Sequence, residues 1–284
     1  MKKYELTTET LQIGGFTLHR IKAVKDFGSV KAGEFGGWIE NEKNLSQYDN
    51  AWVYGDAMVF DNAKVFDNAK VFGNASVFGY ARVYDNAEVY DNAEVCENAK
   101  VCENAKVFDN ANVNGLTRIF GNAKIFGNAI VSDYAKIYCK ADVYSDAIVC
   151  GHAEVYDDAE VYGNAVVYGY AKVYDKANIN NNAEVYGNAE VYGNVRINGN
   201  AYIKGDAKVY DAADYIVFKN FWSSERYFTW TRSNNKWSVG CFHGTGEELI
   251  NKAYADSEKS GREYERVVRY VESILADEKK EREK

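Results

Sequence analysis

The 284-residue sequence contains no proline, and it has only three histidines and two methionines. No apolar run approaches the roughly 20 residues that span a bilayer. Residues Met1 to Glu5 are not followed by the apolar stretch of a secretory signal peptide. These absences predict a cytoplasmic protein that does not enter a membrane.

Cysteine is also scarce, and its spacing argues against a metal site. The sequence has five cysteines, at positions 96, 102, 139, 150 and 241. The count is odd and no pair has the C-x-x-C spacing of a metal or redox site, so we expect reduced thiols and no bound metal. P-loop and GxSxG motifs are missing as well, and we expect no cofactor. A net charge of −8 argues against a generally basic nucleic-acid-binding protein.

Alanine, valine and tyrosine are abundant instead, and they recur every six residues. From Val53 to Val209 every sixth residue is Val or Ile, 27 positions in all. The residue two positions earlier is Ala throughout, except at Thr117 and Val195. Each Val or Ile is usually followed by Tyr or Phe and then by two turn residues, mostly Gly, Asp and Asn.

This spacing predicts a coil of short strands. Ala and Val/Ile alternate with a period of two, so both point to the same face of a strand. Gly, Asn and Asp tolerate positive φ and supply a corner after each strand. A helix is excluded, because β-branched residues at every sixth position do not form a stripe of period 3.6.

At its two inward positions the pattern resembles the hexapeptide repeat of left-handed β-helix proteins, [LIV]-[GAED]-x-x-[STAV]-x. It departs from that repeat at the second position, where Tyr or Phe stands. The resemblance implies a left-handed triangular parallel β-helix with three hexads per coil. Nine coils at about 4.8 Å each would make a rod of roughly 43 Å. Residues 20–40 and 45–57 are similar to the start of YdcK-type hexapeptide proteins, which are described as transferases from their fold.

We predict three parts: an N-terminal β-rich cap (1–44), the β-helix (45–212) and a small α+β domain (213–284). In the cap, apolar and polar residues alternate loosely over positions 11–24, as in a strand. Gly36-Gly37 is expected to form a turn that leads to Trp38. The cap and the C-terminal domain are expected to cover the end coils, whose exposed strand edges would invite polymerisation.

For the C-terminal domain we predict three strands and two helices. The strands are expected at 215–220, 227–231 and 237–242. Capping boxes at Thr245–Glu248 and Ser260–Glu263 are expected to open the helices. This domain resembles tails appended to hexapeptide rods in phage and prophage proteins, which favours a role in binding or sequestering a host factor or ligand.

If 18 residues make one coil, one face of the rod carries both charge and aromatic rings. Seven of nine variable residues on it are basic, among them Lys100 and Arg118, beside an aromatic row that includes Tyr138 and Tyr156. One interpretation is a stripe that binds a planar or anionic ligand, such as a nucleotide, a glycan or an acidic protein. The other is that stacked rings stabilise strand pairing while the cations keep the face soluble.

Another face exposes apolar residues on successive coils. Ile130, Ile148, Val166 and Tyr168 stand where the other faces carry charge. Contiguous exposed apolar area usually marks an interface, so we predict a homodimer or homotrimer through this face. Related left-handed β-helices are commonly trimers, so the family resemblance also implies self-association.

His152 is the one histidine on the rod, and it keeps an enzymatic function open. The family resemblance implies a CoA-dependent acyltransferase that uses a histidine near a subunit groove as general base. However, the hexads run without an inserted loop that could build a pocket, and the alternative interpretation of His152 is an ordinary surface residue at a corner. The leading hypothesis is a non-enzymatic oligomeric scaffold or binding protein. In the C-terminal domain, Trp230 and Arg232 either contact the partner or belong with residues that fill a small core.

Overall fold

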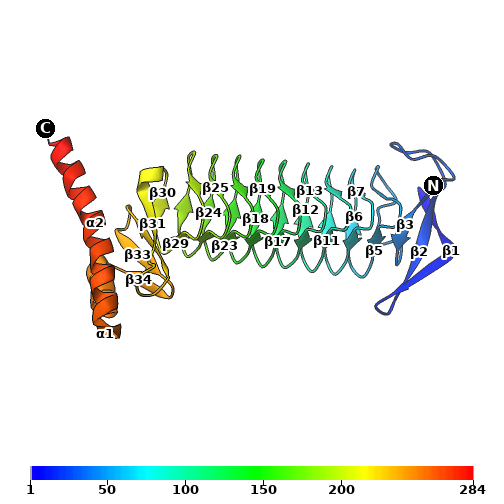
Figure 1. Cartoon of the computed structure of the whole chain (residues 1–284). Coiled ribbons are helices and arrows are strands. Elements are labelled where there is room, and N and C mark those ends of the chain that lie inside the picture. Colours follow the sequence, from blue (N-terminus) through cyan, green and yellow to red (C-terminus); the bar gives the residue numbers. More distant parts are fainter. Residues whose placement is uncertain (1, 284) are drawn as a thin grey trace.

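The computed structural model describes residues 2–283 as a long rod with a β cap at one end and a small α+β unit at the other (Figure 1). The rod contains 27 strands, from β4 (Trp52–Val53) to β30 (Lys208–Val209). Each strand consists of one inward Val or Ile and the residue before it. Residues 18 apart pair in parallel, as Val71, Val89 and Val107 do. Three sheets therefore form three sides, and the predicted parallel β-helix is confirmed. Its left-handed winding stays a prediction.

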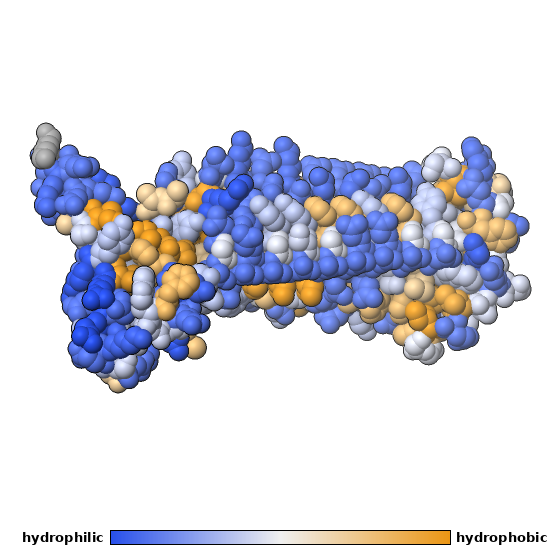
Figure 2. Space-filling model, in the orientation of Figure 1, coloured by the Kyte–Doolittle hydropathy of each residue, from blue (hydrophilic) through white to orange (hydrophobic). Residues whose placement is uncertain are grey.

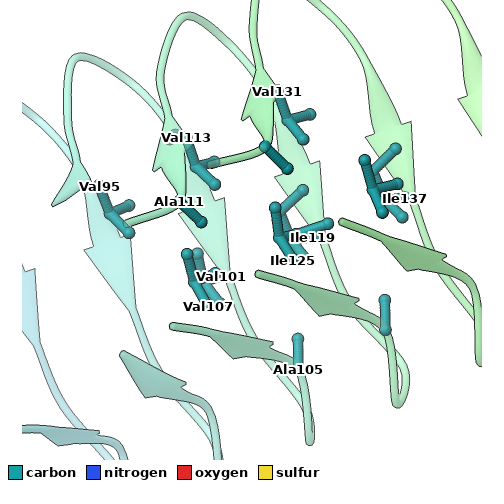
Figure 3. Packing of buried hydrophobic residues seen from close by; sticks show 14 of the residues in the cluster. Val95, Val101, Ala105, Val107, Ala111, Val113, Ile119, Ile125, Val131 and Ile137 are labelled. Atoms are coloured by element: carbon teal, nitrogen blue, oxygen red, sulfur yellow. The ribbon is translucent and has the colours of Figure 1, made fainter. Parts of the chain in front are cut away.

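The inward residues form one continuous core along the rod. Val and Ile from all three sheets meet at the centre, and the alanines fill the space beside them (Figure 3). Thr117 and Val195, which interrupt the alanine track, are buried too. Burying an aliphatic side chain of this size contributes about 1.5–3 kcal/mol, so this column is the main source of stability.

The corners explain why each strand is short. The first corner residue has a left-handed backbone, as at Asp61 (φ 57°) and Gly73 (φ 70°). Asp and Gly adopt this conformation more readily than other residues, and the strand cannot continue through it. Many corner carboxylates also bond the next coil; for example, Asp109 accepts a hydrogen bond from the backbone N–H of Gly127 at 3.0 Å. Acidic residues at these corners are therefore part of the fold.

The N-terminal cap consists of an antiparallel hairpin and one strand that joins the rod. The hairpin is formed by β1 (Tyr4–Ile13) and β2 (Phe16–Ala23). Strand β3 (Phe35–Ile39) pairs antiparallel with β2 and parallel with β5 (Met58–Val59). Leu45 then bridges Val65 on another side. Residues from β3 onward thus add a turn before the repeats, so the rod has about ten turns.

Gly36 and Gly37 lie inside β3, so the predicted turn at these positions is wrong. A Cβ on Gly36 would lie 2.6 Å from the carbonyl oxygen of Val53, and one on Gly37 would lie 2.5 Å from that of Ala57. Both distances are far inside van der Waals contact. The two glycines are present because the cap approaches the first coil too closely for a side chain.

The C-terminal unit packs a four-stranded antiparallel sheet against two helices. The predicted third strand is two strands, because Gly240 (φ 54°) turns the chain between residues 236–239 and 242–244. The elements are η1 (Ala212–Asp214), β31 (Tyr215–Lys219), β32 (Tyr227–Thr231), β33 (Lys236–Val239), β34 (Phe242–Gly244), α1 (Gly246–Asp256) and α2 (Glu258–Arg282).

One of the two predicted capping boxes is present. Thr245 and Glu248 cap α1 as expected. The predicted start of the second helix at Ser260 is wrong, because Ser257 is the extended residue and its hydroxyl accepts the N–H of Ser260. A single extended residue thus ends α1 and begins α2, so the two helices follow each other without a loop.

Side chains from both end units satisfy the backbone of the end coils. At the N-terminal end, the buried ammonium of Lys3 donates to the carbonyl of Ala51 at 2.8 Å. At the other end, the N–H of Tyr202 donates to Thr229 Oγ1 at 2.9 Å, and that of Lys208 to Ser233 Oγ at 2.7 Å. The end units therefore remove the hydrogen-bonding groups that would otherwise recruit further strands.

Candidate anion-binding face

The outward residues of one sheet place cations directly above one another. This sheet contains β6 (Lys64–Val65), β9 (Arg82–Val83), β12 (Lys100–Val101), β15 (Arg118–Ile119) and β18 (Lys136–Ile137) in succession. Their first residues are partners in the parallel register, and we call them the basic row: Lys64, Arg82, Lys100, Arg118 and Lys136. Like charges at neighbouring strand positions repel, so this arrangement is unfavourable unless an anion is bound.

The basic row is poorly compensated by acidic side chains. Within residues 2–283, its first four members have no carboxylate oxygen within 4.0 Å, whereas Lys136 pairs with Glu154 at 2.7 Å. The sheet that starts with β4 differs, because Glu88 lies 3.4 Å from Lys70 and 2.9 Å from Lys106. That face carries both signs of charge, although like charges are neighbours at Lys106 and Lys124 and at Asp142 and Glu160. The basic row is therefore a local excess of positive charge on a chain with a net charge of −8.

The carboxylates closest in sequence to the basic row are already engaged. Asp85 accepts the backbone N–H of Glu103 at 3.0 Å, and Glu103 accepts that of Gly121 at 3.0 Å. Both residues stand at left-handed corners, with φ near 58°. Each carboxylate is held toward the next coil by one oxygen, and among residues 2–283 neither lies within 4.0 Å of a Lys or Arg nitrogen.

An aromatic row runs beside the basic row on the same sheet. Tyr138 and Tyr156 stack with centroids 4.8 Å apart and planes 4° from parallel. Burial within the stack raises the pKa of each of these two phenols to about 12. Their hydroxyls stay protonated at neutral pH and can donate hydrogen bonds. The structure thus places the predicted residues Lys100, Arg118, Tyr138 and Tyr156 on one face, in two parallel rows.

A third row, which sequence reasoning missed, follows the edge beside the basic row. At this corner position most hexads carry Asn, but here Tyr80, Leu116, Tyr134, His152 and Tyr170 stand on the same edge. Tyr80 and Tyr170 are more than 60% exposed. A depression of about 400 Å³ lies between edge and basic row, lined by Asn98, Lys100, Leu116, Arg118, Tyr134, Lys136 and His152. The signal in the sequence was the replacement of Asn at this edge by Tyr80, Leu116, Tyr134, His152 and Tyr170, while Asn62, Asn98 and Asn188 remain.

His152 lies within this edge row and has no orienting partner. Its ring stacks between Tyr134 at 4.6 Å and Tyr170 at 4.8 Å. Among the residues that the structure describes, no side chain forms a hydrogen bond with its ring nitrogens. A histidine that acts as general base needs a neighbour that fixes its tautomer and orientation. The surroundings of His152 therefore indicate a stacking role.

The predicted apolar face is partly covered by the N-terminal hairpin. Met58, Phe60 and Phe78 at its start pack against side chains of β1 and β2, with Phe16 and Phe60 5.2 Å apart. Further along, Ile130, Ile148 and Val166 stack in register, and Ile130 is 39% exposed. Figure 2 shows a hydrophobic patch on the lower side of the rod at its middle, where Figure 1 labels β17 (Ile130–Val131). Nothing else among residues 2–283 is packed over this patch as the hairpin is over Phe60.

A charged residue at the centre of this patch tests the predicted self-association. We expect Ile148→Asp to reduce the mass of the assembly to that of one chain, because an unpaired carboxylate would lie in an apolar contact. Sedimentation velocity measures the mass. The matched control is Ser76→Asp, which lies on the same outward track four coils of 18 residues away. This variant should leave the mass unchanged. An unchanged mass for Ile148→Asp would contradict the interface.

The C-terminal aromatic cluster divides into a buried and an exposed part. Trp230 is 1% exposed, and its indole N–H donates to Asn235 at 2.9 Å. Arg232 forms two hydrogen bonds with the carboxylate of Glu278, at 2.7 and 3.0 Å. Trp230 thus fills the small core, and Arg232 ties the sheet to α2. Phe221 and Trp222 are more than 60% exposed each, and Tyr270 on α2 is 55% exposed.

Fold and site together define a parallel β-solenoid with an uncompensated cationic face. No family model matches the chain. A search of curated proteins also finds no match. Across residues 2–283, no helix has both the length and the apolar character needed to cross a membrane.

Proposed function

We propose that this chain is a non-enzymatic scaffold that binds or sequesters an anionic ligand or partner along its basic row. The uncompensated stack of Lys64, Arg82, Lys100 and Arg118 carries this proposal. Four like charges on successive coils cost free energy in the absence of an anion, and the same fold can compensate its cations, since Glu88 on the β4 sheet pairs with both Lys70 and Lys106. Binding an anion would offset that repulsion.

The rod sets the spacing of the cations, and its assembly sets the number of basic rows. Its strands are about 4.8 Å apart, so the four cations span roughly 15 Å and can contact several charges of one extended ligand. If copies assemble through the apolar patch, each assembly presents several basic rows, and multivalent binding strengthens the capture of a partner.

Acyl transfer is the second candidate, and one observation favours it. His152 lines the same depression as Lys100, Arg118 and Lys136, whose charges suit the phosphates of CoA. The proposal of a binding protein is preferred because His152 is held between two rings and its nitrogens have no partner among the described side chains. The depression is also an open surface feature without an inserted loop to exclude water.

Charge reversal on the two faces tests the proposed function. We expect Arg82→Glu/Arg118→Glu to weaken binding of a dye-labelled polyglutamate peptide at least about tenfold, because the cations that contact it become repulsive. Fluorescence anisotropy at low and physiological salt measures the affinity, which should fall as salt screens the charges. Lys106→Glu/Lys124→Glu changes the net charge equally on the β4 sheet and should leave binding within about twofold.

Two results would overturn this proposal. One is a wild-type chain that shows no binding at low salt. The other is an equal loss in both double variants, because the net charge of the chain, and not the basic row, would then control binding.

A further inference from the structure

The aromatic row beside the basic row is interrupted at one position, which carries no aromatic ring. Phe66 stacks on Tyr84 at 5.0 Å, and Phe120 stacks on Tyr138 at 4.9 Å. The residue between these two stacks is Cys102, which carries no ring. In the repeats from residue 51 to 210, Cys102 is the one outward position at which a single non-aromatic residue separates two rings of a row.

The vacancy has the dimensions of one aromatic ring. The parallel stacked rings in this row are 4.8–5.0 Å apart. Tyr84 and Phe120 are separated by two coils, and so by about 9.6 Å along the rod. A ring inserted midway would have a neighbour at about 4.8 Å on each side, within the range of favourable offset stacking. A cavity of about 260 Å³ lies here, lined by Tyr84, Lys100, Cys102, Arg118 and Phe120.

The floor and the rim of this vacancy are polar. The neighbouring thiol of Cys102, and then burial, raise the pKa of the Tyr84 phenol to about 12. Burial raises the pKa of the Cys102 thiol, so it is protonated and uncharged at neutral pH. Lys100 and Arg118 stand at the rim without a carboxylate within 4.0 Å among the described residues. The cavity thus joins two ring faces to two available cations.

We propose that this vacancy between Tyr84 and Phe120, which we call the notch, binds a planar aromatic ring that carries an anionic group. The chemical class of the ligand is a nucleotide. The base stacks between Tyr84 and Phe120, and the phosphate lies against Lys100 and Arg118. Base–aromatic stacking tolerates any base, because every base has a π face. The guanidinium of Arg118 suits the phosphate, because its donors match the spacing of two phosphate oxygens. This inference rests on the proposed function and names the ligand class for one segment of the basic row.

Filling the vacancy with the protein's own ring provides the decisive variant. We expect Cys102→Tyr to complete the row and to weaken AMP binding at least about tenfold, because its ring takes the place of the base. Cys102→Ala keeps the vacancy and should bind AMP within about twofold of wild type. Calorimetric titration of the full-length chain measures each affinity, and the thermal midpoint of unfolding shows that both variants fold. Cys102→Phe serves in place of Cys102→Tyr if the hydroxyl disturbs the fold.

The thiol provides a second, independent readout. A base in the notch covers Cys102, so AMP should slow its alkylation in the wild-type chain at least about fivefold. Cys139 is exposed at a corner, and its rate should not change. Adenosine and inorganic phosphate, each tested alone, should bind more weakly than AMP, because each makes half of the contacts.

The outcomes separate this inference from the proposed function. Equal AMP affinity in wild type and Cys102→Tyr, or no AMP binding while polyglutamate still binds the basic row, would overturn the notch and leave the anion-binding face intact. If the wild-type chain binds neither AMP nor polyglutamate, both the notch and the proposed function are overturned.

Discussion

Replacing Ile125 by alanine is expected to lower the free energy of unfolding by about 2–5 kcal/mol. Ile125 is fully buried in β16 (Lys124–Ile125), and it faces residues of the other two sheets at the centre of the rod (Figure 3). The coils above and below are hydrogen-bonded to this strand and cannot collapse into the space that the side chain leaves. The cavity therefore stays open, and its cost adds to the lost transfer free energy.

Chemical denaturation followed by circular dichroism measures this effect. Ile125→Val is the conservative control, because valine already fills this position in most hexads, and it should cost about 0.5–1.5 kcal/mol. Lys124→Ala changes the neighbouring outward residue and should stay within about 0.5 kcal/mol of wild type. An alanine variant as stable as the valine variant would mean that the column of inward aliphatics does not provide the main stability.

Removing residues 213–284 is expected to convert the folded rod into an associating species. The truncation exposes the last coil and removes Thr229 and Ser233, which accept the N–H groups of Tyr202 and Lys208. These unpaired edge groups would bind another strand edge. The N-terminal cap still covers the other end of each rod. The exposed C-terminal end of one rod can therefore pair only with that of a second rod, and the resulting dimer cannot add further copies. We therefore expect the mass of the assembly to double in light-scattering measurements.

A rod without either end unit is expected to form fibres. In the segment from 51 to 212, both ends expose parallel strands, so the end of one rod can pair with the start of the next. Such a head-to-tail contact does not close and propagates into filaments, which electron microscopy would show. Soluble single rods from this segment, or fibres from the chain that lacks only residues 213–284, would contradict this role of the end units.

Much of the fold could be predicted because the repeat reports the environment of each position directly. Val and Ile at every sixth residue, preceded by Ala, require a strand with one buried face, and the corner residues require a break after it. The end units were predicted less well. Gly36 and Gly37 read as a turn, because their true requirement is the closeness of the first coil. The third C-terminal strand became two, since one glycine reverses the chain.

The site was predicted in part. The 18-residue coil was enough to stack Lys100 on Arg118 and Tyr138 on Tyr156, as the structure shows. The edge row of Tyr80, Tyr134 and Tyr170 could not be predicted in this way, because a corner position in the sequence indicates a turn and not the neighbours of its side chain. Trp230 could equally contact a partner or fill a core from its sequence alone, and burial decided for the core.

The sequence by itself determined the coil, its period and its core, because each hexad carries its own pattern of buried, outward and corner residues. Only the tertiary structure decided which cations lack a partner and which apolar residues lack a cover. Both depend on atoms from different coils or from the end units: Glu154 neutralises Lys136 from the next coil, and the N-terminal hairpin covers Phe60 but not Ile148. The notch at Cys102 likewise depends on three coils together, since a small cysteine side chain leaves a gap only where Tyr84 and Phe120 place rings on the coils to either side.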